Sequence, residues 1–124
     1  MIHRPRRLRT TPAMRALSAE TGYRASNLIL PMFVREGIDE PEEITSMPGV
    51  YQHTMDSLVE AARKAVDAGV GGLMIFGVPH TRDAIGSAGV DPDGILNRAL
   101  RRLREELGDS TVIISDLCLD EFTD

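Results

Sequence analysis

An apolar segment near the end of the sequence leads directly into acidic residues and the only cysteine. Residues 113–124 read IISDLCLDEFTD, so Asp116, Cys118 and Asp120 follow one another at a spacing of two. Residues two apart in an extended strand point to the same face, so these three side chains would share one side. A thiolate with carboxylates suits a divalent metal ion, with Cys favouring zinc and Asp favouring harder ions. A single cysteine in an apolar strand is also typical of a small core residue, and the acids suit a solvated loop.

The rest of the sequence offers few other catalytic patterns. There is no P-loop, no G-x-G-x-x-G and no nucleophile-elbow context around a serine. The only lysine, Lys64, falls in the middle of a predicted helix and away from its apolar stripe, which indicates a surface charge. Amine-nucleophile chemistry would therefore have to come from residues outside this chain. No metal-binding histidine spacing is formed by His3, His53 and His80.

Three apolar segments predict strands, and two amphipathic segments between them predict helices. Strands are expected over residues 27–34, 71–78 and 111–119, and helices over 54–69 and 91–108. The remaining connections, rich in Gly, Pro and acids, are predicted to be long loops over residues 35–53 and 79–91.

The expected helix starts rest on capping residues. Thr54 or Asp56 can cap the first helix, whereas Asp91 is expected to cap the second, with Pro92 in its first turn. The apolar stripes that should face the core are Leu58, Ala62, Ala65 and Val66 in the first helix and Leu96, Ala99, Leu100, Leu103 and Leu107 in the second.

The alternation of strands and helices predicts an α/β fold with a parallel sheet and right-handed crossovers. The strands lack polar alternation, so both sheet faces need burial, yet two such crossovers place both helices on one face. The strand–helix repeat is about 40 residues long, which suits the first three strands and two helices of a (β/α)8 TIM barrel. The barrel would be incomplete in this chain, and the uncovered sheet face would be its interior. The alternative is a small flavodoxin-like binding domain with an acidic pocket at the strand ends. In either fold the site lies at the carboxyl ends of the strands.

Charge separates a basic N-terminal arm, residues 1–24, from an acidic body, residues 25–124. The arm holds six arginines against the single acid Glu20, while the whole chain carries a net charge of −5. Such an arm suits a solvated tail, a nucleic-acid-binding segment, or a segment that docks on the acidic body of another subunit. The acidic body, and an arm with only Tyr23 as a stacking residue, argue against nucleic acid as a partner. No apolar run reaches the length of a membrane span. A single cysteine fits a reducing compartment, and the predicted location is the cytoplasm.

Six segments in order resemble the N-terminal part of the 5-aminolevulinate dehydratase (porphobilinogen synthase) family. They read RPRRLR, NLILPMFVREG, ITSMPGV, IFGVP, RDAIGSAGVDPDG and SDLCLDEFT, and they span nearly the whole chain. The resemblance implies a (β/α)8 barrel with an arm that wraps a neighbouring subunit, commonly in a homo-octamer. It also implies a lyase that condenses two 5-aminolevulinate molecules to porphobilinogen in heme and tetrapyrrole biosynthesis. The chain would then be a fragment, inactive alone.

The resemblance also implies roles for single residues. The family's two Schiff-base lysines would lie beyond Asp124, and Lys64 matches neither. Zinc-dependent members read Asp-x-Cys-x-Cys in the third strand, so Asp116 and Cys118 match and Asp120 replaces the second Cys. The resemblance therefore implies Asp116 as a catalytic, substrate-facing carboxylate. It implies Cys118 and Asp120 as ligands of a divalent metal, magnesium or zinc.

Three further residues are expected near the same site. Phe76 should pack in the barrel close to it, although plain core packing suits this residue as well. Arg82 and Asp83 belong to the loop 79–91 and are expected to line the site's opening.

Overall fold

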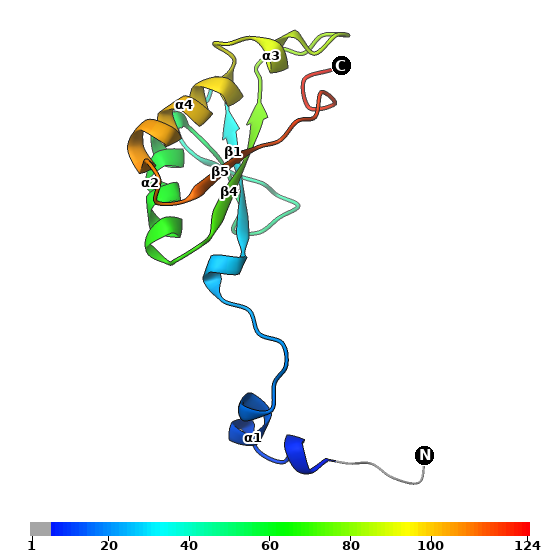
Figure 1. Cartoon of the computed structure of the whole chain (residues 1–124). Helices are drawn as coiled ribbons and strands as arrows, with labels where there is room; N and C mark the ends of the chain where they lie inside the picture. Colours follow the sequence, from blue (N-terminus) through cyan, green and yellow to red (C-terminus); the bar gives the residue numbers. More distant parts are fainter. Residues whose placement is uncertain (1–5) are drawn as a thin grey trace.

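The structure is a computed structural model that describes residues 6–124, so the expectations for His3 and Arg4 lie outside the described residues. Its body is one sheet with two helices packed on a single face, and an N-terminal arm extends away from it (Figure 1). The strands are β1 (Ile29–Arg35), β2 (Glu42–Glu43), β3 (Tyr51–His53), β4 (Gly72–Val78) and β5 (Val112–Ser115). The helices are α1 (Pro12–Leu17), α2 (Met55–Asp67), α3 (Ser87–Val90) and α4 (Ile95–Leu107), with short 3-10 turns η1 (Arg7–Arg9) and η2 (Ala25–Asn27).

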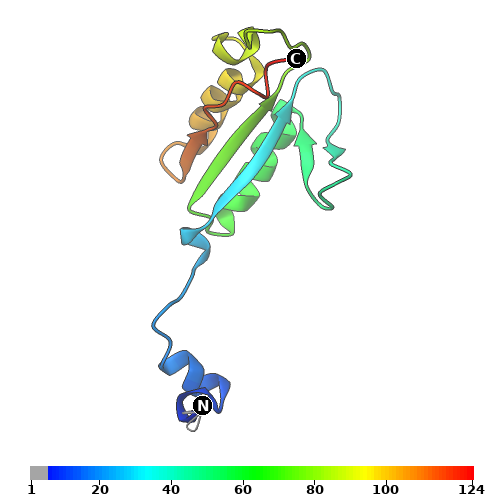
Figure 2. The ribbon, with the colours of Figure 1, turned by 90° about the vertical axis from the view of Figure 1, so that its right-hand side faces the viewer.

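The predicted parallel sheet is confirmed. Its order is β2-β3-β1-β4-β5, and β1, β4 and β5 run parallel, with Phe33 level with Phe76 and Ile75 level with Ser115. The α2 and α4 helices lie on the same face of these strands (Figure 2). The crossovers thus leave the opposite face without a covering layer, as the sequence predicted.

The expectation of a plain loop over residues 35–53 is wrong, because β2 and β3 form within it. They pair antiparallel, and β3 also pairs parallel with β1. The Arg35 guanidinium ties these segments by donating to the Glu42 carboxylate at 2.7 Å and to the Gln52 side-chain carbonyl at 3.0 Å. Two glutamates in a row carry no strand pattern of their own, so the pairing depends on these partners.

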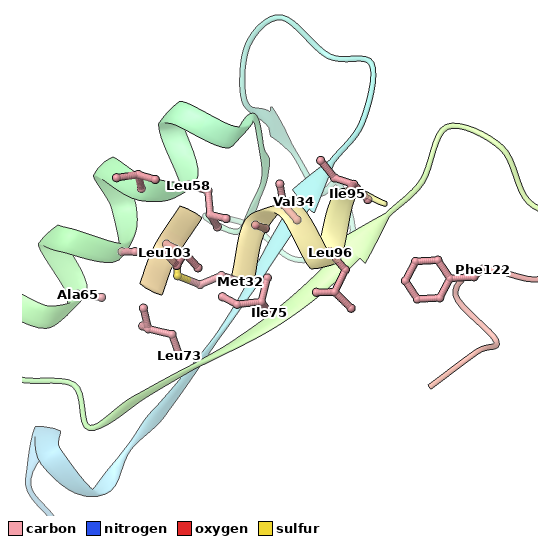
Figure 3. Packing of buried hydrophobic residues seen from close by; sticks show 13 residues of the cluster. Met32, Val34, Leu58, Ala65, Leu73, Ile75, Ile95, Leu96, Leu103 and Phe122 are labelled. Carbon is pink, nitrogen blue, oxygen red and sulfur yellow. The ribbon is translucent and has the colours of Figure 1, made fainter. Parts of the chain in front are cut away.

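Both apolar helix stripes face the sheet and form the core (Figure 3). The buried apolar residues are Met32, Val34, Leu58, Val59, Ala62, Ala65, Leu73, Ile75, Ile95, Leu96, Ala99, Leu103 and Phe122. Lys64 is on the outer surface of α2, where it pairs with Glu60 at 2.7 Å, so its prediction as a surface charge is confirmed. Within residues 6–124 no helix has the length and apolar character to cross a bilayer.

The two helix starts differ in how well the sequence predicted them. Thr54 caps α2, because its hydroxyl oxygen accepts from the Ser57 amide at 3.2 Å. The cap expected at Asp91 is wrong: α4 begins at Ile95, and Gly94 is its N-cap residue. The Asp91 carboxylate instead accepts from the Asp93 amide at 2.9 Å, and this local turn keeps the chain out of the helix for three more residues.

The uncovered face of the sheet is apolar. Phe33 and Phe76 stack there, with ring centroids 5.2 Å apart and ring planes 25° from parallel. Ile29 and Val112, from the first and last parallel strands, are 53% and 61% exposed. Such a face requires a cover in any stable assembly.

The arm forms local structure without joining the core. The Thr11 hydroxyl oxygen caps α1 by accepting a hydrogen bond from the Met14 amide at 3.1 Å. Among the described elements, the short turn η1 is the one with which α1 has extensive contact. None of the residues in η1 or α1 is buried, and the arm stands clear of the sheet in both views (Figures 1 and 2). Exposed apolar side chains occur along it at Leu8, Leu17 and Tyr23.

Candidate functional site

The carboxyl ends of the parallel strands and the segments that follow them meet at one edge of the sheet (Figure 1). Backbone and side-chain bonds join the ends of β1 and β4. The Glu36 amide donates to the Val78 carbonyl at 3.0 Å, and the Glu36 carboxylate accepts from the His80 amide at 3.1 Å. These bonds hold the starts of the two long connections together beside the site predicted from the sequence.

Asp116 is the first residue after β5 and is half-buried. Its amide donates to the Ile75 carbonyl at 3.3 Å, which extends the parallel ladder one residue past the strand. Because Ser115 pairs with Ile75, the register sets Asp116 level with Phe76. Alternation along the strands then places Asp116 on the uncovered face, next to the stacked Phe33–Phe76 pair. A carboxylate beside an apolar surface can hold a cationic or amine group by a charge-assisted hydrogen bond.

The expectation that Asp116, Cys118 and Asp120 share one strand face is wrong. The strand ends at Ser115, and the Phe122 amide donates to the Leu119 carbonyl at 2.9 Å to close a turn. Cys118 and Asp120 are exposed within this turn-forming segment. An apolar strand pattern cannot signal such a turn, because the turn is set by where Phe122 packs.

Cys118 and Asp120 nevertheless contact each other, since the thiol donates to the Asp120 carboxylate. That hydrogen bond raises the pKa of the Cys118 thiol, and the negative charges of Asp120 and Asp116 raise it further, against an opposing contribution from the Asp120 backbone. The thiol therefore favours its protonated form, whereas zinc binds the thiolate. Nowhere in residues 6–124 do three His, Cys, Asp or Glu side chains gather closely enough to hold a metal ion. The two donors together do not fit a closed zinc site, which takes four ligands.

Glu121 is a site residue that the sequence did not single out. One of its carboxylate oxygens is buried without a hydrogen-bond partner, alone among the described side chains. Burial raises the pKa of the Glu121 carboxyl, and the charges of Asp116 and Asp120 raise it further, while Arg82 opposes them. A carboxyl group whose pKa is raised by burial can hold a proton for acid–base chemistry. The one signal in the sequence for this partial burial of Glu121 is the large apolar residue next to it, Phe122, which is buried in the structure.

Arg82 and Asp83, from the loop 79–91, differ in what they contact. Arg82 is the basic group whose charge acts on Glu121, so it lies toward the acidic segment. The Asp83 carboxylate instead accepts from the Ser87 amide at 2.9 Å and the Ile85 amide at 3.2 Å. Hydrogen bonds from Ser87 lower the pKa of Asp83, which keeps it ionised as a support for α3.

Comparison with known proteins gives a consistent result. A protein-family model described as delta-aminolevulinic acid dehydratase matches residues 2–124. A delta-aminolevulinic acid dehydratase from Mycobacterium leprae is 68% identical over 124 residues, covering 98% of this chain and 38% of that relative. Its counterparts from Mycobacterium tuberculosis H37Rv and Streptomyces coelicolor are 65% and 61% identical, each covering 98% of this chain and 37% of the relative. The chain thus spans 37–38% of the length of these curated relatives.

A solved structure matches the whole fold. The crystal structure of delta-aminolevulinic acid dehydratase (porphobilinogen synthase) from Toxoplasma gondii ME49, in complex with the reaction product porphobilinogen, superposes with a TM-score of 0.89 at 29% identity. The match covers 100% of this chain and 35% of that one. The parallel strands β1, β4 and β5 with helices α2 and α4 are therefore the first part of a (β/α)8 barrel, as the sequence predicted, and the uncovered face is its interior side.

Proposed function

The chain belongs to the delta-aminolevulinic acid dehydratase family, and from this premise we propose that the full-length protein condenses two molecules of 5-aminolevulinate to porphobilinogen. The observation that carries the proposal is the family match over residues 2–124. The porphobilinogen-bound neighbour, whose fold covers the entire chain, supports it. The reaction is a lyase step with loss of water that supplies tetrapyrrole and heme biosynthesis. Its Schiff-base lysines come from residues outside this chain, because Lys64 is a surface charge paired with Glu60.

The direct test is formation of porphobilinogen from 5-aminolevulinate by the full-length protein, followed by mass spectrometry. Borohydride added during turnover should trap a covalent adduct on lysine. A Lys64→Ala variant is the matched control and should keep both activity and trapping. A protein that makes no porphobilinogen but binds a small molecule as a monomer would instead support the flavodoxin-like binding domain.

Within this function, Asp116 is the residue that would touch substrate. Its half-buried carboxylate would accept from the substrate amine and orient it, while the Phe33–Phe76 pair supplies an adjacent apolar surface. An apolar surrounding excludes water and so strengthens that interaction. Glu121, whose pKa is raised by burial, adds a nearby carboxyl able to hold a proton.

We further propose a divalent metal cofactor, magnesium or zinc, near residues 116–124, with Cys118 and Asp120 as the ligands that this chain supplies. The two side chains are in contact and exposed, which supports them as a pair. These residues supply only two donors and the thiol favours its protonated form, so other residues would have to complete the metal's coordination. The single cysteine also supports a cytoplasmic location, where thiols stay reduced.

We expect that the full-length protein does not depend on zinc held by a three-cysteine cage. Asp120 replaces a thiolate by a carboxylate, which lowers preference for zinc and favours oxygen-loving ions such as magnesium. Metal analysis after purification should show substoichiometric zinc, and Cys118→Ala should keep most of the activity. Stoichiometric zinc together with inactive Cys118→Ala would show that one cysteine with carboxylate partners is enough.

The N-terminal arm is proposed to act in assembly of a homo-oligomer, in particular an octamer. Among residues 6–24, the arginines and the exposed Leu8, Leu17 and Tyr23 pack on no surface of the body, whose net charge is opposite. A second copy of the chain offers that acidic surface.

Deleting residues 1–15 from the full-length protein should lower the oligomer order and reduce activity indirectly. Light scattering coupled to size exclusion measures the mass, and a salt series checks the electrostatic part. An unchanged mass after deletion would refute the assembly role. Tight DNA binding by the intact protein, lost on deletion, would support nucleic-acid binding instead.

A further inference from the structure

Phe122 is the one buried residue in a segment, residues 116–124, that is otherwise exposed or half-buried. Its ring is 2% exposed, while Leu117 and Leu119 from the same segment are 101% and 50% exposed. Figure 3 shows the ring at one end of the core cluster, apart from the side chains that fill the space between the helices and the sheet. A segment of mostly exposed residues that buries one aromatic ring is anchored through that ring.

Two glycines, Gly86 and Gly89, form a socket for residues 119–123, and the Phe122 ring itself packs against Gly89. A Cβ atom on Gly89 would lie 3.0 Å from Phe122 Cδ2 and 3.1 Å from Cγ, closer than side chains normally pack. A Cβ atom on Gly86 would meet Leu119 and Thr123 at 3.5 Å, and Gly86 has a φ of +66°, which favours glycine. The absence of side chains at these two positions thus lets residues 119–123 pack closely on the loop 79–91.

Backbone bonds reinforce the same contact. The Asp83 amide donates to the Phe122 carbonyl at 3.4 Å, and Asp83 in turn holds the start of α3 through the Ser87 amide. Among the described residues, the other hydrogen bonds made by residues 117–124 stay within that segment. The Asp83 bond is therefore the hydrogen bond that ties residues 117–124 to the rest of the described fold, and the packing of residues 119–123 on Gly86 and Gly89 accompanies it.

We propose that Phe122 is a positioning residue that couples the acidic segment 116–124 to the loop 79–91. With its ring in the socket, the segment that carries Asp116, Cys118 and Asp120 is held against the strand ends. The consequence for activity rests on the proposed function, whereas the coupling between the two segments does not. Displacement of a substrate-facing group by about 1 Å costs on the order of 10²-fold in rate, which makes such an anchor consequential.

The test uses the full-length protein with Phe122→Ala, and Leu117→Ala as the matched control from the same segment. Hydrogen exchange followed by mass spectrometry should show faster amide exchange in both 79–91 and 116–124 for Phe122→Ala, with α2 unchanged. The kcat for porphobilinogen formation should fall about 10- to 100-fold, with a much smaller change in KM. Leu117→Ala should match the wild type in both measurements.

A size exchange across the socket gives a second, milder test. Gly89→Ala improves helix propensity in α3 but places a methyl group against the ring, so it should speed exchange in both segments and lower kcat. Adding Phe122→Leu should restore part of the loss, because the smaller side chain leaves room for the methyl group. A merely additive double variant would argue against the socket.

The outcomes separate this inference from the proposed function. Faster exchange confined to 116–124 after Phe122→Ala would overturn the coupling, as would equal losses in Leu117→Ala. A wild-type protein that makes no porphobilinogen would refute the proposed function, while the exchange data would still decide on the coupling. If Phe122→Ala fails to fold, the same measurements on Phe122→Leu, on Gly89→Ala and on the double variant test the coupling.

Discussion

Asp116→Asn is expected to lower kcat for porphobilinogen formation by the full-length protein by about 10²- to 10³-fold, as removal of a preorganised electrostatic group commonly does. Asparagine has nearly the same size as aspartate, and its backbone amide can still donate a hydrogen bond to the Ile75 carbonyl. The end of β5 should therefore be unchanged. What it removes is the negative charge, at a half-buried position beside the stacked rings of Phe33 and Phe76. Steady-state kcat and KM for 5-aminolevulinate measure the loss.

Two controls make the Asp116 result specific. Asp109→Asn removes an exposed carboxylate that pairs with Arg104 at 2.6 Å, and should leave activity unchanged. The pH profile of activity is an independent check. The negative charge of Asp116 helps to raise the pKa of Glu121, so Asp116→Asn should lower the pKa of Glu121. Retention of more than a tenth of the activity, with Glu121 unaffected, would show that Asp116 does not face the reacting groups.

The second large effect concerns the 124-residue chain by itself, which we expect to self-associate. Its three parallel strands expose an apolar face that includes Ile29 and Val112, and β5 has an unpaired edge. Uncovered apolar faces and free strand edges both drive association. Light scattering coupled to size exclusion should report a mass of several chains, and thermal unfolding should be broad.

Two single variants distinguish the uncovered face from the arm as the cause. Val112→Lys places a charge on the face and edge of β5 and should lower the associated fraction. Leu17→Lys changes an exposed apolar residue of the arm and should leave association through the face unchanged. A sharp, cooperative transition from a monomer would show that the uncovered face does not drive association.

The parts of the fold that follow local rules could be predicted from the sequence. The stripe with Leu58 and Ala62 and the stripe with Ala99 and Leu103 predict helices that bury those faces, and these residues are buried. The Thr54 cap and the surface position of Lys64 follow from chain-local chemistry in the same way. The order of strands and helices then restricts the sheet to a parallel one.

The parts that depend on distant partners could not be predicted. The β2 strand exists because β3 and Arg35 bind it, not because Glu42 and Glu43 favour a strand. The end of β5 and the turn after it go with the packing of Phe122 against Gly89, which lies more than 30 residues earlier in the chain. The alternation that grouped Cys118 with Asp116 fails for this reason, and the burial of Glu121 follows from the same packing.

The order of the core elements along the chain also has a consequence for synthesis. The parallel strands β1 and β4 pair across the intervening residues 36–71, and such non-local pairing forms slowly. A nascent chain emerging from the ribosome can complete the core around Met32, Leu58 and Ile75 only after α4 is free. The Phe33–Phe76 face has no cover at that stage, so the time until later strands arrive is the interval in which a growing polypeptide most needs protection by chaperones.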